Sequence, residues 1–172
     1  MVLFSRVEHV ERVEVRGDMD NGRVEQVDRV ERLKALATKV GQVAYGVHEY
    51  FGNGLLEKVY ETALVHRLFK AGFKVERQWP LKVYDSDGYC VGEFLVDLLV
   101  DDELIVELKA VRTLAPEHLA QTLNYMKITD SPIALLVNFG SYKFERRTVV
   151  ASSSSTRSTC STRQNLGVTN DT

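Results

Sequence analysis

The chain has 172 residues, of which 44% are hydrophobic and 27% are charged, and its formal net charge is -2. This composition is typical of a folded protein with one sizeable apolar core, and the length favours a single domain. The slightly acidic balance excludes a globally basic nucleic-acid-binding protein, so contact with nucleic acid would depend on a local patch.

Cysteine usage and hydropathy bear on the compartment. The two cysteines, Cys90 and Cys160, are too few for a disulfide framework or a zinc site. No apolar run approaches the roughly 18 residues of a membrane-spanning helix, and the N-terminus lacks the apolar segment of a signal peptide. We therefore expect a cytoplasmic protein with no membrane partner.

The two ends of the chain differ from its middle. Residues 1–23 contain "VEHVERVE", which is echoed by "VEQVDRVE" at 24–31, and we expect them to be an extension of uncertain or disordered structure. Residues 151–172 are rich in Ser and Thr and cannot bury enough apolar surface to be ordered. The remaining residues, 24–150, form the predicted domain. Valines spaced by three leave open a homo-oligomer formed through the N-terminal helices.

The first half of this domain predicts two helices. Apolar residues recur at spacings of three and four from Val27 to Phe51, which is helical periodicity. The breaker "FGNG" follows, and a second helix is expected from Leu55 to about Lys70, with Tyr60 and Leu64 on its apolar stripe.

The second half predicts three strands, a helix and two strands. The strand-like runs are 73–84, 89–100 and 103–111, and Pro80 in the first run indicates an edge strand or a bulge. A helix follows from Pro116 to about Lys127, and residues 133–139 and 142–150 complete the order. This order predicts an α/β or α+β fold with a mixed sheet.

The alternation of side chains along the second and third strands predicts how they pair. Leu98 and Val106 belong to the two apolar sets, 96/98/100 and 104/106/108/110, which must face one core. A three-residue loop at 101–103 keeps these sets together, whereas a two-residue loop would mix them. Asp97 and Glu107 then lie side by side on the other face, with Cβ atoms roughly 4.5–5.5 Å apart.

Two carboxylates this close repel each other, by about 1 kcal/mol in water and several-fold more when partly desolvated. Lys109 on the same face, a shared proton or a divalent cation would relieve the repulsion, and hard oxygen ligands suit Mg²⁺ or Mn²⁺. The alternative is an open sheet face with an ordinary Asp, Glu and Lys. Leu95, Leu99 and Ile105 on this face indicate instead that something covers it.

Two helices are available to cover it. Glu57 precedes Tyr60 by three residues and projects from the apolar stripe of the second helix, although a first-turn glutamate can simply complement the helix dipole. Gln121 and Tyr125 share a face of the later helix, where they can also be an ordinary polar edge. Together with the strand residues they suit metal-assisted attack of water on a phosphodiester.

This order of motifs resembles the PD-(D/E)XK nuclease superfamily and, within it, the bacterial GxxExxY family. The resemblance covers roughly residues 40–150 and is carried by "GLLEKVY", "VDLLVDDELIVELKAV", "HLAQTLNY" and "IALLVNFG". It implies a restriction-endonuclease-like core in αβββαβ order with an extra N-terminal helix.

The resemblance also implies roles for the site residues. Asp97, Glu107 and Glu57 would be catalytic acids that hold Mg²⁺ or Mn²⁺, and Lys109 would be the catalytic lysine. Gln121 and Tyr125, with Tyr60, would support the site. The expected activity is metal-dependent hydrolysis of nucleic acid, with DNA as the expected partner. The alternative is a binding module for nucleic acid or protein that keeps the fold without catalysis.

Overall fold

The computed structural model describes residues 21–151, so the predicted N-terminal extension and the Ser/Thr-rich tail lie almost entirely outside the described residues. The elements follow the predicted order of two helices, three strands, a helix and two strands. They are α1 (Asn21–Phe51), α2 (Glu57–Lys70), β1 (Val75–Tyr84), β2 (Cys90–Val100), β3 (Leu104–Lys109), α3 (Pro116–Thr129), β4 (Ile133–Asn138) and β5 (Glu145–Val150).

The five strands form one mixed sheet in the order β1-β2-β3-β4-β5. β3 and β4 are parallel and the other neighbours are antiparallel. The parallel pair needs a crossover connection, and α3 supplies it. β1 is an edge strand, as the position of Pro80 predicted. The predicted α/β fold with a mixed sheet is therefore confirmed, and it is consistent with a restriction-endonuclease-like core.

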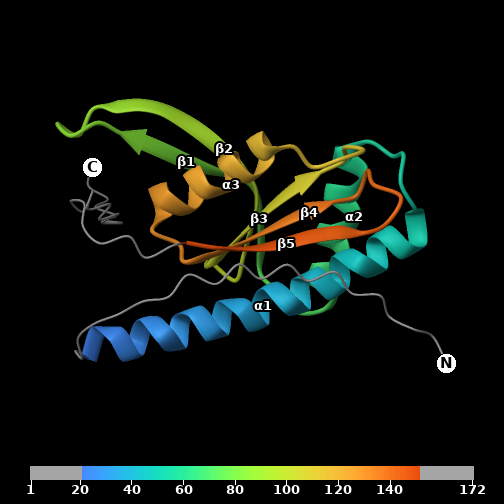
Figure 1. Ribbon diagram of the computed structural model, residues 1–172, viewed down its shortest axis with the longest axis horizontal. Coiled ribbons are helices and arrows are strands. Elements are labelled where there is room, and N and C mark those ends of the chain that lie inside the picture. Colours follow the sequence, from blue (N-terminus) through green and yellow to red (C-terminus); the bar gives the residue numbers. More distant parts are fainter. Residues whose placement is uncertain (1–20, 152–172) are drawn as a thin grey trace, which may run out of the picture.

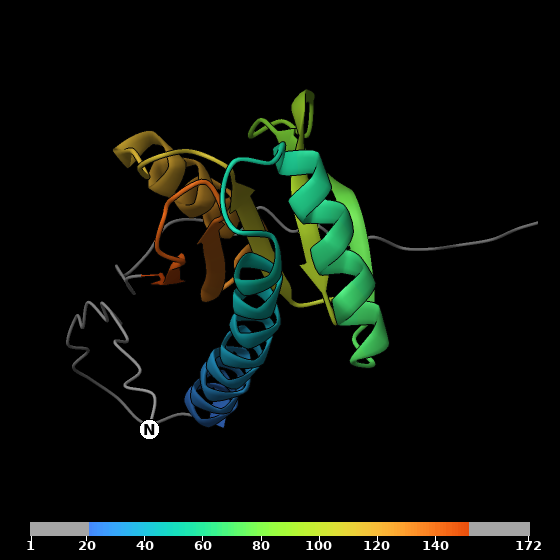
Figure 2. The ribbon, with the colours of Figure 1, turned by 90° about the vertical axis from the view of Figure 1, so that its right-hand side faces the viewer.

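Helices cover both faces of the sheet. The core on one side joins α1 and α2 to the strands, and it includes Val40, Leu64 and Val106. The core on the other side joins α3 to the strands, and it includes Tyr125 and Ile105. Figure 2 shows α3 and α2 on opposite sides of the sheet, and Figure 1 shows α1 running along the length of the molecule. The carboxylate-bearing face of β3 is thus covered, as its apolar neighbours indicated.

The β2–β3 hairpin has the predicted register. Val100 pairs with Leu104 and Leu98 pairs with Val106, which leaves a three-residue connection at 101–103. Asp101 and Asp102 take φ values of 51° and 62° there, and aspartate tolerates this left-handed conformation better than most residues. Asp97 and Glu107 are the next residues along the two strands, and Glu107 alternates with Ile105, whose side chain packs in the core under α3.

One detail of the predicted alternation is wrong. Val96 was expected to share the core of Leu98, but Val96 packs on the α3 side, whereas Leu98 packs on the α1–α2 side. β1 changes face at the same step, because Val75 contacts the α1–α2 core and Trp79 contacts the α3 core. Between them, Gln78 has a φ of 48°, a left-handed conformation that breaks the pleat of a strand.

The outer halves of β1 and β2 form an arm that extends beyond the other strands (Figure 1). Residues 90–95 of β2 are exposed along this arm. The inner halves lie under the helices, so the face change at Gln78 separates the arm from the core. Among residues 21–151, no helix is both long enough and apolar enough to cross a membrane.

Candidate active site

Asp97 lies where β2 and β3 begin to separate. The ladder between these strands ends at the pair Leu98–Val106. Beyond it, Oδ2 of Asp97 accepts a hydrogen bond of 2.8 Å from the backbone N–H of Leu108. The aspartate side chain thus replaces a strand partner, which fixes the carboxylate against β3 beside Glu107.

Glu107 and Lys109 project from the same face of β3. Nζ of Lys109 donates a hydrogen bond of 2.6 Å to Oε1 of Glu107. Glu107 is only 1% exposed, although Lys109 keeps more contact with solvent. The second oxygen of Glu107, Oε2, is buried and has no hydrogen-bond partner among the described residues. A buried carboxylate oxygen without a partner is costly unless it carries a proton or binds a ligand.

The electrostatics of this cluster follow from its burial. Burial and the neighbouring charge of Asp97 raise the pKa of Glu107 to about 7. Burial also raises the pKa of Asp97, against the lowering effect of its hydrogen bond from Leu108. Burial opposes the charge on Lys109, but its hydrogen bond to Glu107 and the nearby carboxylates outweigh that effect and raise its pKa. Lys109 is therefore held as an ammonium ion.

Glu57 approaches the site from the first turn of α2. Its Oε2 accepts a hydrogen bond of 3.0 Å from the backbone N–H of Ala110, the residue after Lys109. The charge of Glu57 also contributes to the raised pKa of Glu107. The structure therefore brings Glu57 to the end of β3, where it ties α2 to the strand that carries the catalytic candidates.

Tyr60, the other predicted supporting residue, lies where the α1–α2 loop meets the start of α2. Its ring is buried and stacks on Phe139, with ring centroids 4.7 Å apart. Its hydroxyl donates to the carbonyl of Gly52 at 2.8 Å and accepts from the N–H of Leu55 at 3.2 Å. Tyr60 thus holds the α1–α2 loop and the start of α2, and through that helix it positions Glu57.

α3 brings Gln121 and Tyr125 over the same face of the sheet. Nε2 of Gln121 donates to the hydroxyl of Tyr125 at 2.7 Å. Burial raises the pKa of Tyr125, and the charges of Glu107 and Asp97 raise it further. Tyr125 packs in the same buried cluster as Ile105 of β3 and Leu136 of β4. The predicted Gln-x-x-x-Tyr pair therefore lies on the helix that covers this face of the sheet.

Glu61 and Gln78 form a second layer that the sequence reasoning missed. Glu61 is buried on α2, where Arg77 contacts Oε1 at 2.8 Å and Lys58 contacts Oε2 at 3.0 Å. Nε2 of Gln78 lies 3.4 Å from both Glu61 Oε2 and Asp97 Oδ1. Gln78 thus links the buried glutamate to the site aspartate. The position of Glu61, four residues after Glu57 on one helix face, was the available signal.

Asn138 and Gly140 contact the residues that follow β3, and the sequence reasoning missed them as well. Oδ1 of Asn138 accepts hydrogen bonds from the N–H groups of Val111 and Gly140 at 3.1 Å and 3.0 Å. A Cβ atom on Gly140 would lie 2.4 Å from the carbonyl carbon of Ala110. The close approach requires glycine and packs the β4–β5 loop against the chain just after Lys109.

The donor atoms present fit a divalent cation held by few protein ligands. Among residues 21–151, no group of three or more His, Cys, Asp or Glu side chains converges into a complete metal cage. Mg²⁺ commonly uses only one or two carboxylates and completes its shell with water and phosphate oxygens. The unpartnered Oε2 of Glu107 beside the charge of Asp97 meets that requirement. Asp97 and Glu107 are the residues that would hold the ion.

Comparison with known families identifies the class of protein. Residues 34–149 match the model of the PD-(D/E)XK nuclease superfamily, and this stretch is more than half of the chain. The chain therefore belongs to the PD-(D/E)XK nuclease superfamily, whose members typically depend on a metal. A search of curated proteins and a search of solved structures each found no match.

Proposed function

We propose that this protein is a divalent-metal-dependent nuclease that hydrolyses phosphodiester bonds of nucleic acid. The observation that carries the proposal is the buried Glu107–Lys109 pair, whose unpartnered carboxylate oxygen lies next to Asp97 on a covered sheet face. Motif residues Gly54, Glu57 and Tyr60 further support a place in the GxxExxY family within the superfamily.

The chain's own residues divide the chemistry between them. Asp97 and Glu107 would hold Mg²⁺ or Mn²⁺, and a bound ion of this kind would lower the pKa of water and stabilise charge on phosphate oxygens. Lys109, held as an ammonium ion, orients the attacking water and offsets the negative charge that develops on the phosphate. As the water oxygen bonds to phosphorus, the bond between phosphorus and the leaving oxygen breaks; the proton of the water passes to solvent, and solvent protonates the leaving oxygen.

Residues around these groups hold them in place. Glu57 fixes the backbone at Ala110, and Gln78 orients Oδ1 of Asp97. Gln121 and Tyr125 form a hydrogen-bonded pair on α3, the helix that covers this face of the sheet. Pre-arrangement of this kind favours catalysis because no group must reorganise during the reaction.

Cleavage assays with matched variants test the proposal. We expect wild-type protein to cut labelled single-stranded or double-stranded DNA or RNA only when Mg²⁺ or Mn²⁺ is added. Asp97→Asn and Glu107→Gln are nearly isosteric and remove one ligand charge each, so both should abolish cleavage while the melting temperature shows an intact fold. Cleavage in EDTA, or equal cleavage by wild type and both variants, would refute the proposal.

A non-catalytic binding module predicts a different pattern. Such a protein would bind nucleic acid or a protein partner equally well in EDTA and in Mn²⁺, and it would cut no member of the substrate panel. Calorimetric titration with Mn²⁺ separates the two cases further, because the nuclease proposal requires binding that Asp97→Asn weakens.

A further inference from the structure

The α2 surface carries a groove that the catalytic cluster does not use. It has a volume of about 670 Å³ and is lined by Phe51, Lys58, Val59, Thr62, Ala63, His66, Arg67 and Lys70. Four of these residues have basic side chains, and none of the eight lining residues, all within the described part of the chain, is acidic. A surface with this charge attracts phosphates.

The basic side chains follow the axis of α2. Lys58, His66 and Lys70 lie on one ridge of the helix with Thr62, because they are spaced by four or eight residues. At 1.5 Å per residue, the distance along the axis from Lys58 to Lys70 is about 18 Å. A stacked strand rises by about 3.4 Å per nucleotide, so the groove has the length of about five nucleotides.

Aromatic rings line one rim of the groove at the end of α1. Tyr50 is 74% exposed, and its ring lies at 4.8 Å from that of Phe51, which itself lines the groove. The guanidinium of Arg67 sits over the Tyr50 ring at 5.4 Å from its centroid. Exposed rings beside a basic groove suit unpaired bases, whose faces are free to stack.

A chain of contacts connects the Lys58 end of the groove to the candidate active site. Lys58 follows Glu57, whose carboxylate binds the N–H of Ala110 next to Lys109. Lys58 also contacts Glu61, and Gln78 connects Glu61 to Asp97. A strand lying along α2 would therefore have one end near the terminus of α2 that carries Glu57.

We infer that this groove binds a single-stranded segment of nucleic acid, with phosphates along Lys58, Arg67 and Lys70 and a base on Tyr50. The inference rests on the proposed nuclease function and specifies where its substrate lies. The basic charge of the groove favours nucleic acid over a second copy of the chain, because a symmetric contact between two grooves would place like charges against each other. The exposed Tyr50 ring favours a single strand over a duplex, because the bases of a duplex are already stacked on each other.

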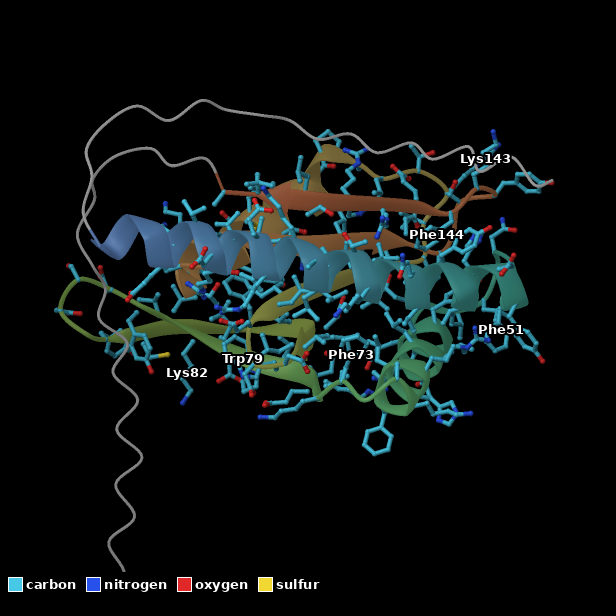
Figure 3. The ribbon with its side chains drawn as sticks, turned by 90° about the horizontal axis from the view of Figure 1, so that it is seen from below. Phe51, Phe73, Trp79, Lys82, Lys143 and Phe144 are labelled. Atoms are coloured by element: carbon cyan, nitrogen blue, oxygen red, sulfur yellow. The ribbon has the colours of Figure 1, made fainter. Side chains whose placement is uncertain are left out.

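Binding measurements in EDTA isolate the groove from catalysis. The probe is a short fluorescent oligothymidylate, followed by fluorescence anisotropy over a series of salt concentrations. The test protein is the double variant Arg67→Gln/Lys70→Gln, which keeps good helix formers on α2. The matched control is Lys82→Gln, since Lys82 is an exposed lysine on β1 at the opposite end of the molecule from Phe51 (Figure 3).

The expected result has two parts. The double variant should bind about tenfold more weakly, and its plot of log affinity against log salt should be less steep by about 1.4, because each lost phosphate contact removes about 0.7 for a single strand. Tyr50→Leu should also weaken binding about tenfold while leaving the salt slope unchanged, because it removes stacking and no charge. Lys82→Gln should bind like wild type, and melting temperatures verify that all variants are folded.

Several results would overturn the inference. One is equal affinity and salt slope for wild type, the double variant and Lys82→Gln. Another is an unchanged affinity together with a shift in oligomeric state by light scattering, which would assign the groove to a second copy. Absence of any binding by wild type would also overturn it.

The outcomes for the groove and for the nuclease proposal are separable. Groove-dependent binding without cleavage would support the groove and refute the enzyme. Metal-dependent cleavage combined with wild-type binding by the groove variants would support the nuclease proposal and refute the groove inference.

Discussion

Lys109 and Glu107 form an ion pair across two positions of β3, with Nζ 2.6 Å from Oε1, while Oε2 of the same glutamate is buried with no hydrogen-bond partner in the described residues. One oxygen of this carboxylate is therefore paired with an ammonium of the protein, and under the proposed function the other would bind the metal ion.

The charge and length of Lys109 should decide activity. Lys109→Met keeps the buried stem but removes the ammonium, so we expect cleavage to fall by about 10²–10³, the usual effect of losing one charge-stabilising donor. Lys109→Arg keeps the charge and should retain more activity than Lys109→Met. Single-turnover cleavage rates provide the measurement. Equal rates for the two variants would show that the charge of Lys109 is not what matters.

The stability of the metal-free protein should depend on pH through Glu107. Its pKa is raised from an ordinary 4.5 to about 7, so between these values the folded protein binds the proton more tightly than the unfolded chain does. The free energy of unfolding should therefore fall as pH rises from about 4.5 to about 7, with a contribution from Glu107 on the order of 3 kcal/mol. Urea unfolding in EDTA across this range measures the effect. Glu107→Gln cannot ionise and should reduce the pH dependence; an identical profile in this variant would contradict the assignment.

Metal affinity should change with pH in the opposite direction. A proton and a divalent cation compete for Glu107, so the apparent affinity for Mn²⁺ should increase by up to about tenfold per pH unit below about 7 and level off above it. Isothermal titration with Mn²⁺ at several pH values measures this change. Asp87→Asn, in the exposed turn between β1 and β2, is a control that should leave the profile unaltered. A flat profile in the wild type would place the metal away from Glu107.

Loss of the Gln78 contacts with Asp97 and Glu61 should change the affinity for Mn²⁺ more than it changes the free energy of unfolding. Gln78→Gly suits the φ of 48° but removes the amide that contacts Asp97 and Glu61. We expect Mn²⁺ affinity to fall by about 10- to 100-fold, as for other groups that orient metal ligands, with little change in the free energy of unfolding.

Gln78→Asn is the matched control for this experiment, because asparagine also tolerates a left-handed backbone and retains a shorter amide. Its Mn²⁺ affinity should lie between those of wild type and Gln78→Gly. Equal Mn²⁺ affinity in all three proteins would remove Gln78 from the positioning of Asp97.

The contact between Gly140 and the end of β3 should be intolerant of any side chain. A methyl group at this position would meet the backbone of Ala110 and Val111 at 2.4 Å, so the β4–β5 loop or the β3 exit must move. We expect Gly140→Ala to cost about 1–3 kcal/mol in the free energy of unfolding and to lower cleavage, since Lys109 lies one residue before the displaced backbone. Gly88→Ala, with a φ of 86° but open space around its Cβ position, separates backbone strain from this steric contact.

The residues alone predict most of the fold because its signals are local. Helical spacing in α1 and α2, the turn at 101–103 and the apolar alternation near Leu98 and Val106 each depend on neighbours in sequence. These signals also predict that Asp97, Glu107 and Lys109 share one sheet face, since successive side chains of a regular strand point to opposite sides. The register of the β2–β3 hairpin and the covering of that face agree with this prediction.

Other features depend on contacts between segments distant in sequence. The face change at Gln78 arises from a left-handed residue in a strand, which no alternation pattern encodes, and it moved Val96 to the α3 core. Glu61 joins the site only because α2 packs beside β1, and Gly140 limits the backbone of Ala110 only because β4 lies parallel to β3. Periodicity describes which side of an element a residue occupies, but the packing of elements determines which residues it meets there.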